Sequence, residues 1–374
     1  MYYNCDYQKQ TVMKEAAKQQ LGDIYTDYLM VSTSLCTATG LSELTGGTVS
    51  HDKITRLLNS DAFNSKEVWK KVKPFIREIE NNQGCLSIDD SIQGKPYTDQ
   101  SALICWHFDH TKNRSVKGVN FISANYCYEG GSLPVAVDFV RKPLLVTDKK
   151  TGKVKRKSAK TKNCMYRELL QTAIDNRINF GYVLNDIWFS SAENMLYVKH
   201  HIKANFVMAI KGNRKVALSQ EEKLKGKYVK IEALELEPCS TLEVWFKQVD
   251  FPVLLTRQVF KNEDGSQGIL YLVSSDLDLT YEKITAIYQK RWKVEEYHKS
   301  VKSNACFAKS PTKVENTQLG HFYASILAYV KYEVLKFRHG RNHFALKATL
   351  YMTALKAAYE QLKKYDTIPI FQIA

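Results

Sequence analysis

The sequence has no Cys-x-x-Cys pair and no histidine tract, although eight cysteines are scattered along its 374 residues. The usual zinc motifs are therefore absent, and the irregular spacing gives no disulfide framework. We expect the cysteines to be small buried side chains in a reducing compartment. A basic and then apolar leader is also missing, and the longest apolar stretch, residues 321–335, is interrupted by Lys331 and Glu333. We therefore expect a cytoplasmic protein with no membrane segment.

Negative charge is scarce relative to positive charge: 39 Asp and Glu stand against 54 Lys and Arg, for a formal charge of +15. An excess of this size indicates a polyanion as partner, with nucleic acid first among the candidates. A basic protein whose charge serves only solubility is the simpler alternative. Hydrophobic residues at 44% leave room for a sizeable core, and the length predicts two or three domains.

Residues 1–80 have apolar positions at steps of three and four and few strand formers, which predicts a helical region. Ser50 is placed to cap a helix over residues 51–58, after a Gly-Gly turn. The apolar positions of this helix can face a core while Lys53 and Arg56 project outward, as in the recognition helix of a DNA-binding motif. An ordinary surface helix with a solvated basic face fits equally well.

After residue 84 the pattern changes to short apolar runs, typical of strands. Three antiparallel strands, a helix, a strand, a helix and a strand are expected in that order. This order is typical of a ribonuclease-H-like α/β core, in which carboxylates lie at the ends of adjacent central strands. The expected strands are 85–90, 118–128, 133–140, 181–185 and 205–211, with helices near 163–176 and 191–201.

The rest of the chain completes this division into domains. Residues 81–211 and 280–305 are expected to form the catalytic core, after the helical DNA-binding region of residues 1–80. Residues 212–279 return to strand-type alternation and predict a β-rich insertion within the core. Two amphipathic stretches follow, so residues 306–374 are expected to be C-terminal helices.

Residues 288–302 are predicted to form one helix with a long polar face. The acid in the middle of this face, with bases around it, suits a surface opposite a phosphate backbone. A solvated face with an ordinary Arg291–Glu295 ion pair satisfies the same spacing, so spacing alone predicts only a polar face. The polar residues that follow one another at steps of three or four are Tyr288, Arg291, Glu295, His298 and Lys302.

The spacing Tyr-x2-Arg-x3-Glu-x6-Lys in this segment resembles the signature of a large group of bacterial insertion-sequence DDE transposases. The string Arg-Trp-Lys-Val-Glu-Glu-Tyr-His-Lys (291–299) is similar to the hairpin-forming, cut-and-paste members of that group. Two more segments agree: Leu-Ser-Ile-Asp-Asp-Ser (86–91) resembles the first catalytic strand of the group, and Val-Leu-Asn-Asp-Ile-Trp-Phe-Ser (183–190) resembles the second. The resemblance covers about residues 85–302.

The resemblance implies a triad of metal-binding carboxylates, with Asp186 second and Glu295 third. For the first, the family pattern of Asp, any residue, then Ser or Thr selects Asp89, while Asp90 remains the alternative if the strand register slips. Phosphodiester chemistry of this kind uses two divalent metals about 3.5 to 4 Å apart. Mg²⁺ prefers carboxylate oxygens, and we expect two Mg²⁺ ions, with Mn²⁺ as a substitute.

The same resemblance assigns the bases of this segment to DNA. Tyr288, Arg291 and Lys302 would bind phosphates near the cut, Arg291 through a bidentate fork, and Lys299 would assist. In hairpin-forming relatives an aromatic residue of the insertion stacks on a flipped base, and Trp245 is the candidate there, although a place in the β core suits it better. The segment 106–110, with two histidines and an acid, is interpreted as a structural cluster.

The expected function is therefore that of a DNA transposase, a nucleoid-associated cytoplasmic enzyme of bacteria. It would cut double-stranded DNA at the terminal inverted repeats of a transposon and join the freed ends to target DNA. Because two ends have to be synapsed, we expect a dimer on DNA. Two alternatives remain: a ribonuclease-H-like nuclease or resolvase with the same carboxylates, and a decayed transposase that only binds DNA.

Overall fold

The computed structural model describes residues 3–149, 152–237, 239–261 and 264–366. The chain divides into two compact units. One comprises residues 1–68 and 298–374, and the other comprises residues 69–297. Each unit is described by itself below, and the larger one contains the sheet that carries the carboxylates.

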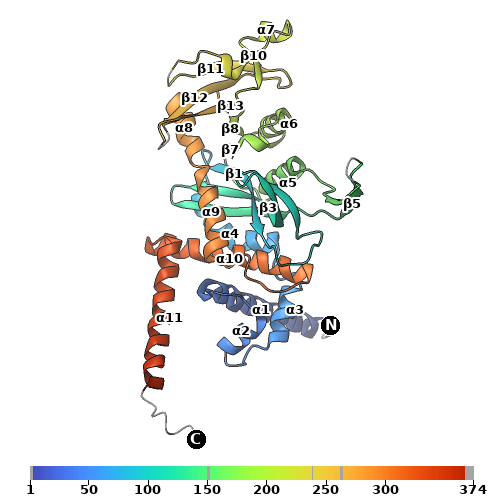
Figure 1. Ribbon diagram of the computed structural model, residues 1–374, viewed down its shortest axis with the longest axis vertical. Coiled ribbons are helices and arrows are strands. Elements are labelled where there is room, and N and C mark those ends of the chain that lie inside the picture. Colours follow the sequence, from blue (N-terminus) through green and yellow to red (C-terminus); the bar gives the residue numbers. More distant parts are fainter. Residues whose placement is uncertain (1–2, 150–151, 238, 262–263, 367–374) are drawn as a thin grey trace. The chain divides into compact units, whose positions relative to one another are not determined.

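A large mixed sheet organises the unit of residues 69–297, and within the described residues eleven strands belong to it (Figure 1). β1 lies between β3, to which it is antiparallel, and β7, to which it is parallel, and β7 is parallel to β8. β3 also pairs antiparallel with β2 and β4. The bounds are β1 Cys85–Gly94, β2 Cys105–Asp109, β3 Arg114–Tyr128, β4 Gly131–Phe139, β7 Tyr182–Asn185 and β8 Asn205–Ile210.

The strands and helices expected in this part of the chain occur in the expected order, but three strands that were not expected lie among them. The sequence missed β2, because this strand is only five residues long and its exposed aromatic residues do not fit a pattern of apolar buried and polar exposed positions. Helix α5 contacts β3 and β4, so it covers one face of the sheet. The helical elements between the strands are α5 Lys162–Asp175, η1 Ile187–Phe189, α6 Ala192–Leu196 and η2 Tyr197–Ile202.

The segment predicted to be β-rich does consist mainly of strands, and these continue the same sheet. β13 pairs antiparallel with β8, β12 pairs with β13, and β11 pairs with β12. Consecutive strands pair from β11 to β13, and the non-consecutive pairing of β13 with β8 joins them to the rest of the sheet. The elements are β9 Lys215–Ala217, α7 Gln220–Leu224, β10 Val229–Lys230, η3 Ile231–Ala233, β11 Leu242–Phe246, β12 Val253–Lys261 and β13 Gln267–Ser274.

The predicted single helix over residues 288–302 is wrong, because two helices meet there. α8 spans Tyr281–Gln289 and α9 spans Trp292–Asn304. Between them the backbone N–H groups of Lys290 and Arg291 donate to the carbonyls three residues earlier, at 3.2 and 2.9 Å. Such i to i−3 bonds tighten the chain into a turn and change the direction in which Arg291 projects.

The first part of α9 packs against the sheet through apolar residues. Val294 and Tyr297 are fully buried, and the Tyr297 ring meets Phe121 of β3 edge to face at 6.4 Å between centroids. Val294 joins a core cluster with Leu184 of β7 and Val207 of β8. Burying these side chains holds the helix, and with it Glu295, over the centre of the sheet.

The unit of residues 1–68 and 298–374 is helical. Tyr25 and His321 are both fully buried and joined by a 2.8 Å hydrogen bond between α1 and α10. A Cβ at Gly320 would lie 2.1 Å from the carbonyl oxygen of Leu58, so glycine permits the close approach of α10 to α3. The helices are α1 Tyr3–Val31, α2 Ala38–Leu44, α3 His51–Leu58, α10 Glu315–His339 and α11 His343–Asp366, while α4 Ser65–Ile79 crosses between the units in sequence.

Three smaller expectations can be compared with the structure. The side chain of Ser50 accepts a hydrogen bond from the N–H of Lys53, so the predicted cap of α3 is confirmed. Five described cysteines are buried as expected, but Cys239 is exposed, and Cys5 lies outside the residues whose side chains are described. The basic segment after β4 contains a two-stranded ribbon, β5 Leu144–Thr147 with β6 Val154–Lys157. In the described residues no helix has the length and hydropathy needed to cross a membrane.

Candidate functional site

Two of the predicted acids follow neighbouring positions of parallel strands. Ile88 of β1 is paired with Asn185, the last residue of β7, so Asp89 and Asp186 are the residues that follow this pair. Adjacent strands lie about 4.8 Å apart, so this register brings the two carboxylates to one edge of the β1–β7 pair. Asp89 is still inside β1, whereas Asp186 begins the short helix η1.

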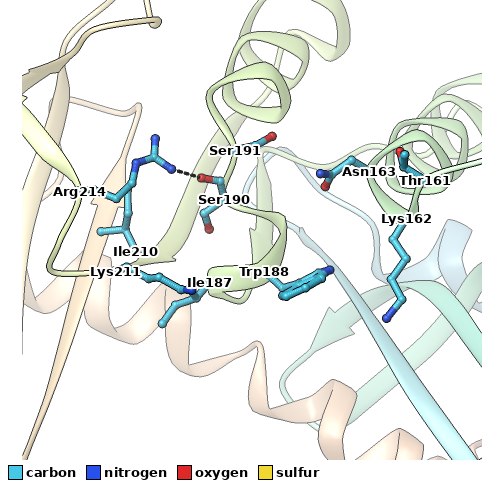
Figure 2. Close-up of a pocket in the computed structure, with 10 residues that line it drawn as sticks. All are labelled: Thr161, Lys162, Asn163, Ile187, Trp188, Ser190, Ser191, Ile210, Lys211 and Arg214. Carbon is cyan, nitrogen blue, oxygen red and sulfur yellow. Dashed lines mark hydrogen bonds between the residues drawn. The ribbon is translucent and has the colours of Figure 1, made fainter. Parts of the chain in front are cut away.

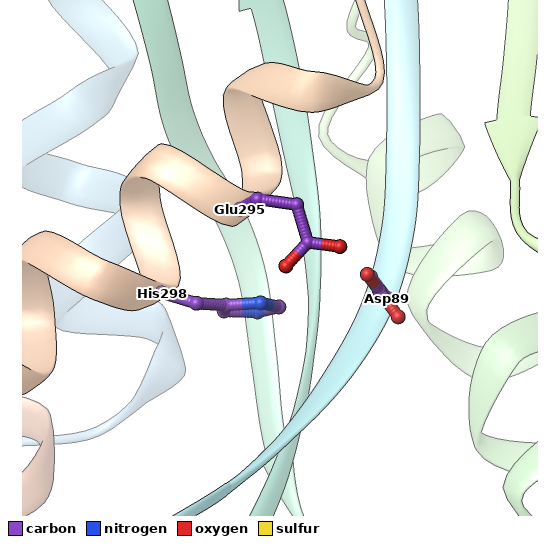
Figure 3. A group of neighbouring side chains, drawn as sticks. All are labelled: Asp89, Glu295 and His298. Atoms are coloured by element: carbon purple, nitrogen blue, oxygen red, sulfur yellow. The ribbon is translucent and has the colours of Figure 1, made fainter. Parts of the chain in front are cut away.

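The third predicted acid reaches Asp89 from a distant part of the sequence. Carboxylate oxygens of Glu295, on α9, and of Asp89 lie within 4.8 Å of one another (Figure 3). Glu295 stands in the first turn of α9, and His298 follows it one helical turn later on the same helix. The side chain of Glu295 is 42% exposed and that of Asp89 only 12%, so the pair has one open side.

Arg291 connects these two carboxylates. Its Nη1 lies 3.3 Å from Oδ2 of Asp89 and 3.3 Å from Oε1 of Glu295. Burial by itself would lower the pKa of Arg291, but Tyr288 and the surrounding acids raise it above its usual value. The guanidinium therefore remains charged and partly neutralises two acids that would otherwise repel each other.

Burial and mutual repulsion act on the acids. Desolvation raises the pKa of Asp89 well above its usual value, and the negative charges of Asp186 and Glu295 raise it further. Burial also raises the pKa of Asp186, while the N–H of Trp188 lowers it by donating a hydrogen bond. Carboxylic acids whose pKa values are raised by burial and by neighbouring acids are typical of functional sites.

Asp90 has different neighbours, because successive side chains of a strand point to opposite faces of the sheet. Its Oδ2 accepts a 2.9 Å hydrogen bond from Nδ2 of Asn120 and lies 2.7 Å from Nζ of Lys162. The register that sets Asp89 beside Glu295 thus turns Asp90 toward α5. Sequence reasoning missed Lys162 as the partner of Asp90, since no local spacing relates two residues so far apart in sequence.

Of the three predicted acids, Asp89 and Glu295 lie close together, and Asp186 lies farther from this pair. Within the described residues, the group of ligand atoms that lie within 4.8 Å of one another includes Asp89 and Glu295 but not Asp186. Oδ1 of Asp186 instead accepts a 3.0 Å hydrogen bond from the N–H of Trp188, as the cap of η1. Asp186 is close enough for its negative charge to raise the pKa of Asp89.

The residues predicted to contact DNA lie in varied surroundings. Tyr288 packs against the core with the Arg291 guanidinium 5.7 Å above its ring, and burial raises its pKa to about 12. Lys302 is half-buried, while Lys299 is exposed with its ammonium 5.3 Å above the Phe344 ring.

The predicted recognition helix keeps its bases at the surface. Lys53 and Arg56 are exposed on α3, whose apolar residues face inward. Trp245, the tryptophan considered for base stacking, is half-buried on β11 with the Lys223 ammonium 5.1 Å above its ring. Val244 and Phe246, on either side of it, are buried, so Trp245 itself is not part of the buried core.

The donor set at Asp89 and Glu295 fits a divalent cation. Both donors are carboxylates, the hard oxygen ligands that Mg²⁺ and Mn²⁺ prefer. A cation between them would favour the ionised forms that burial and repulsion now disfavour. Asp186 follows the β7 residue that pairs with Ile88, but its carboxylate lies outside this group of ligand atoms.

The chain matches a known protein family over more than half of its length. Residues 10–228 match the family described as DDE superfamily endonuclease, and the chain belongs to this family. The matched range includes Asp89 and Asp186 and ends before Glu295. Membership supports a nuclease- or transposase-type enzyme with DNA as substrate, and nucleases of this superfamily use divalent metals. Among curated proteins, no sequence matches this chain.

Proposed function

We propose that this protein is a DDE transposase that cuts DNA at the ends of an insertion sequence and joins those ends to target DNA. The observation that carries the proposal is the approach of Glu295 to Asp89, within 4.8 Å, across more than half of the chain. The ion pair of Arg291 with Glu295, one helical turn apart, does not by itself bring Glu295 to Asp89. A site that assembles distant acids is what metal-dependent phosphoryl transfer needs.

The strand arrangement supports a ribonuclease-H-like core. The central order β4, β3, β1, β7, β8, with β3 antiparallel and β7 and β8 parallel to β1, places Asp89 in the middle strand and Asp186 after its neighbour. The strands from β9 to β13 would then be the insertion before the helix that carries Glu295. In this scheme Asp89, Asp186 and Glu295 are the catalytic triad.

The three carboxylates would hold two Mg²⁺ ions, which, when bound, activate the attacking oxygen and stabilise the leaving oxygen. In the first step water adds to a phosphorus at the transposon end, and the bond to the 3′ oxygen breaks to leave a 3′-hydroxyl and a 5′-phosphate. In the second step that hydroxyl attacks a target phosphodiester, whose own 3′ oxygen leaves. A hairpin on the transposon end is the proposed intermediate between the two steps: the 3′-hydroxyl attacks the opposite strand, whose flanking 3′ oxygen leaves, and water then opens the hairpin and restores the 3′-hydroxyl.

The protein's own cations position the DNA. Arg291, which holds both acids before metal binds, would turn its guanidinium to a phosphate oxygen near the cut once the metals neutralise the carboxylates. Tyr288, Lys299 and Lys302 would contact the neighbouring backbone. Lys53 and Arg56 on α3 would contact the terminal repeat, and two copies would hold the two ends together.

Cleavage of a terminal-repeat duplex by the purified protein tests the proposal. We expect cutting at the repeat boundary with Mg²⁺ or Mn²⁺ and none with EDTA. Glu295→Gln should abolish cutting and leave DNA binding intact, while Glu296→Gln is the matched control. Glu296 is exposed and pairs with Lys293 at 2.9 Å, so its loss should leave cleavage within about threefold of wild type.

The double variant Lys53→Ala, Arg56→Ala separates a transposase from a nuclease of the same family. In a transposase it should lower end-specific cutting and leave the metal-dependent activity on non-specific DNA. Point substitutions suit this test better than removal of residues 1–80, because residues 1–68 pack with residues 298–374 in one unit. Equal cutting of all sequences by wild type would identify a nuclease, and no cutting by wild type would identify a DNA-binding protein.

A further inference from the structure

Three exposed rings, from β2, the turn after it and η1, lie next to one another in a row. Phe108, on β2, is 48% exposed, and the His110 ring lies 4.9 Å from it, centroid to centroid. Trp188, which follows Asp186, is 50% exposed, and its ring centroid lies 4.9 Å from that of His110. We call Phe108, His110 and Trp188 the aromatic row.

Neighbouring polar residues of β2 have structural roles, which the aromatic row does not share. His107 is buried beside Cys105 at 3.3 Å, and burial lowers its pKa to about 3. Asp109 accepts hydrogen bonds from the backbone of the following turn. Scattered exposed aromatic residues are ordinary on protein surfaces, but a contiguous row from two separate segments indicates a binding surface.

A cavity of about 530 Å³ opens beside Trp188 (Figure 2). Its volume is within the range of roughly 300 to 1,000 Å³ typical of sites for small organic groups. Among the described residues, its lining includes three cations and no acid. The cations are Lys162, Lys211 and Arg214.

These cations line the same cavity as the Trp188 ring. The Lys162 ammonium lies 5.8 Å above the Trp188 ring, and Lys211 is exposed at the end of β8. Arg214 is fixed by a 3.2 Å hydrogen bond to the carbonyl of Ser190. An apolar ring beside positive charge is complementary to a nucleotide, which presents a flat base and an anionic phosphate.

The row and the cavity adjoin the carboxylates through one residue. The backbone N–H of Trp188 donates to Oδ1 of Asp186 at 3.0 Å, so a base stacked on the Trp188 ring would lie close to the Asp186 carboxylate. Bases in a duplex are stacked on each other and cannot offer a face to a side chain. A nucleotide that stacks here therefore has to be unpaired.

We propose that the aromatic row and the cavity beside Trp188 bind unpaired nucleotides of the DNA strand next to the scissile phosphate. The bases stack on Trp188 and its neighbours, and Lys211 and Arg214 hold the phosphates. This inference rests on the proposed function for the identity of the strand. It assigns base stacking to Trp188, which is 50% exposed, and not to the half-buried Trp245.

Binding measured without metal tests this assignment independently of cleavage. The anisotropy of a short fluorescein-labelled oligodeoxythymidine gives single-strand affinity, and a labelled duplex of similar length gives duplex affinity. Trp188→Ala should weaken single-strand binding roughly 5- to 150-fold, the effect of losing one stacked base, and leave duplex binding within about threefold. Trp188→Phe should restore most of the affinity, and Trp188→Leu should not.

The control is Phe260→Ala, which removes a similarly exposed ring, at 45%, from β12, a strand that β13 and β8 separate from β7. It should change neither affinity. The fluorescence of a 2-aminopurine in the strand should change on binding to wild type and to Phe260→Ala, and Trp188→Ala should reduce that change, because stacking on the indole contributes to the quenching of this base.

Unchanged single-strand affinity in Trp188→Ala, or an equal loss for strand and duplex, would overturn the proposal. Either result leaves the transposase assignment untouched if Glu295→Gln still abolishes cutting. Conversely, Trp188-dependent strand binding by a protein that never cuts DNA would uphold the binding surface and reject the transposase assignment.

Discussion

Arg291 and Asp89 are 202 residues apart in sequence, yet Nη1 of Arg291 lies 3.3 Å from Oδ2 of Asp89. The side chains are 14% and 12% exposed, so the contact is largely withdrawn from water. The turn between α8 and α9 projects the guanidinium toward the sheet, and the same cation also meets Glu295. A positive charge thus occupies the space between acids that are proposed to bind metal.

The two adjacent acids of β1 should respond differently to substitution. Asp89→Asn removes a carboxylate from the proposed metal site and should lower the cleavage rate by at least about a thousandfold, several kcal/mol of transition-state stabilisation. Asp90→Asn removes only the contacts with Lys162 and Asn120 and should lower the rate less than about tenfold. Single-turnover cleavage assays measure both rates. A larger loss for Asp90→Asn than for Asp89→Asn would exchange their roles.

Metal-free stability should fall as pH rises from about 4 toward neutrality. The folded-state pKa values of Asp89 and Asp186 are raised above the usual 3.8, so between that value and the raised pKa the folded state holds more protons than the unfolded state. Stability therefore decreases with increasing pH through this window. Melting curves in EDTA measure the decrease, which Asp89→Asn should reduce.

Adding Mn²⁺ at neutral pH should reverse this loss, because a cation bound only by the folded state stabilises it by mass action. The melting temperature should rise with metal concentration in wild type and much less in Asp89→Asn. An equal rise in both proteins would place the metal elsewhere.

Removal of Arg291 should destabilise the metal-free protein more than the metal-bound protein. Arg291→Met leaves Asp89 and Glu295 without their shared cation, which should reduce the free energy of unfolding by about 2 to 4 kcal/mol in EDTA. Metal can replace the missing charge and should recover part of the loss. Lys293→Met is the control, since its exposed pair with Glu296 contributes less than about 1 kcal/mol. Urea denaturation with and without Mn²⁺ compares the variants.

Gly118 supports the strand that carries Asp89. A Cβ at this position would lie 2.0 Å from the carbonyl oxygen of Gln93, where β3 pairs with both β1 and β2. Gly118→Ala should therefore reduce the free energy of unfolding by about 1 to 3 kcal/mol. Its partner in the register, Gly94, is the control, because a Cβ there would meet only Val116 at 3.5 Å. Thermal melts that show equal losses would contradict this explanation.

Much of the secondary structure could be predicted from sequence, because its signals are local. The apolar alternation of the strands, the Ser50 cap and the buried face of α3 depend on residues a few positions apart. The break before α9 could not be predicted, because the helical spacing of Tyr288, Arg291 and Glu295 continues through it. Tertiary packing of Tyr288 against the core accompanies the turn there.

Some features of the candidate site could likewise be predicted from sequence, and others could not. Sequence by itself identified Glu295 and Arg291 as neighbours, since both lie within about one helical turn, and it favoured Asp89 over Asp90 only through the family pattern. Strand register then distinguished the two acids: pairing with β7 and the pleat of β1 direct Asp89 toward Glu295 and Asp90 toward Lys162. Neither the register nor the cavity beside Trp188 has a local sequence signal, because both arise from segments that meet only when the chain is folded.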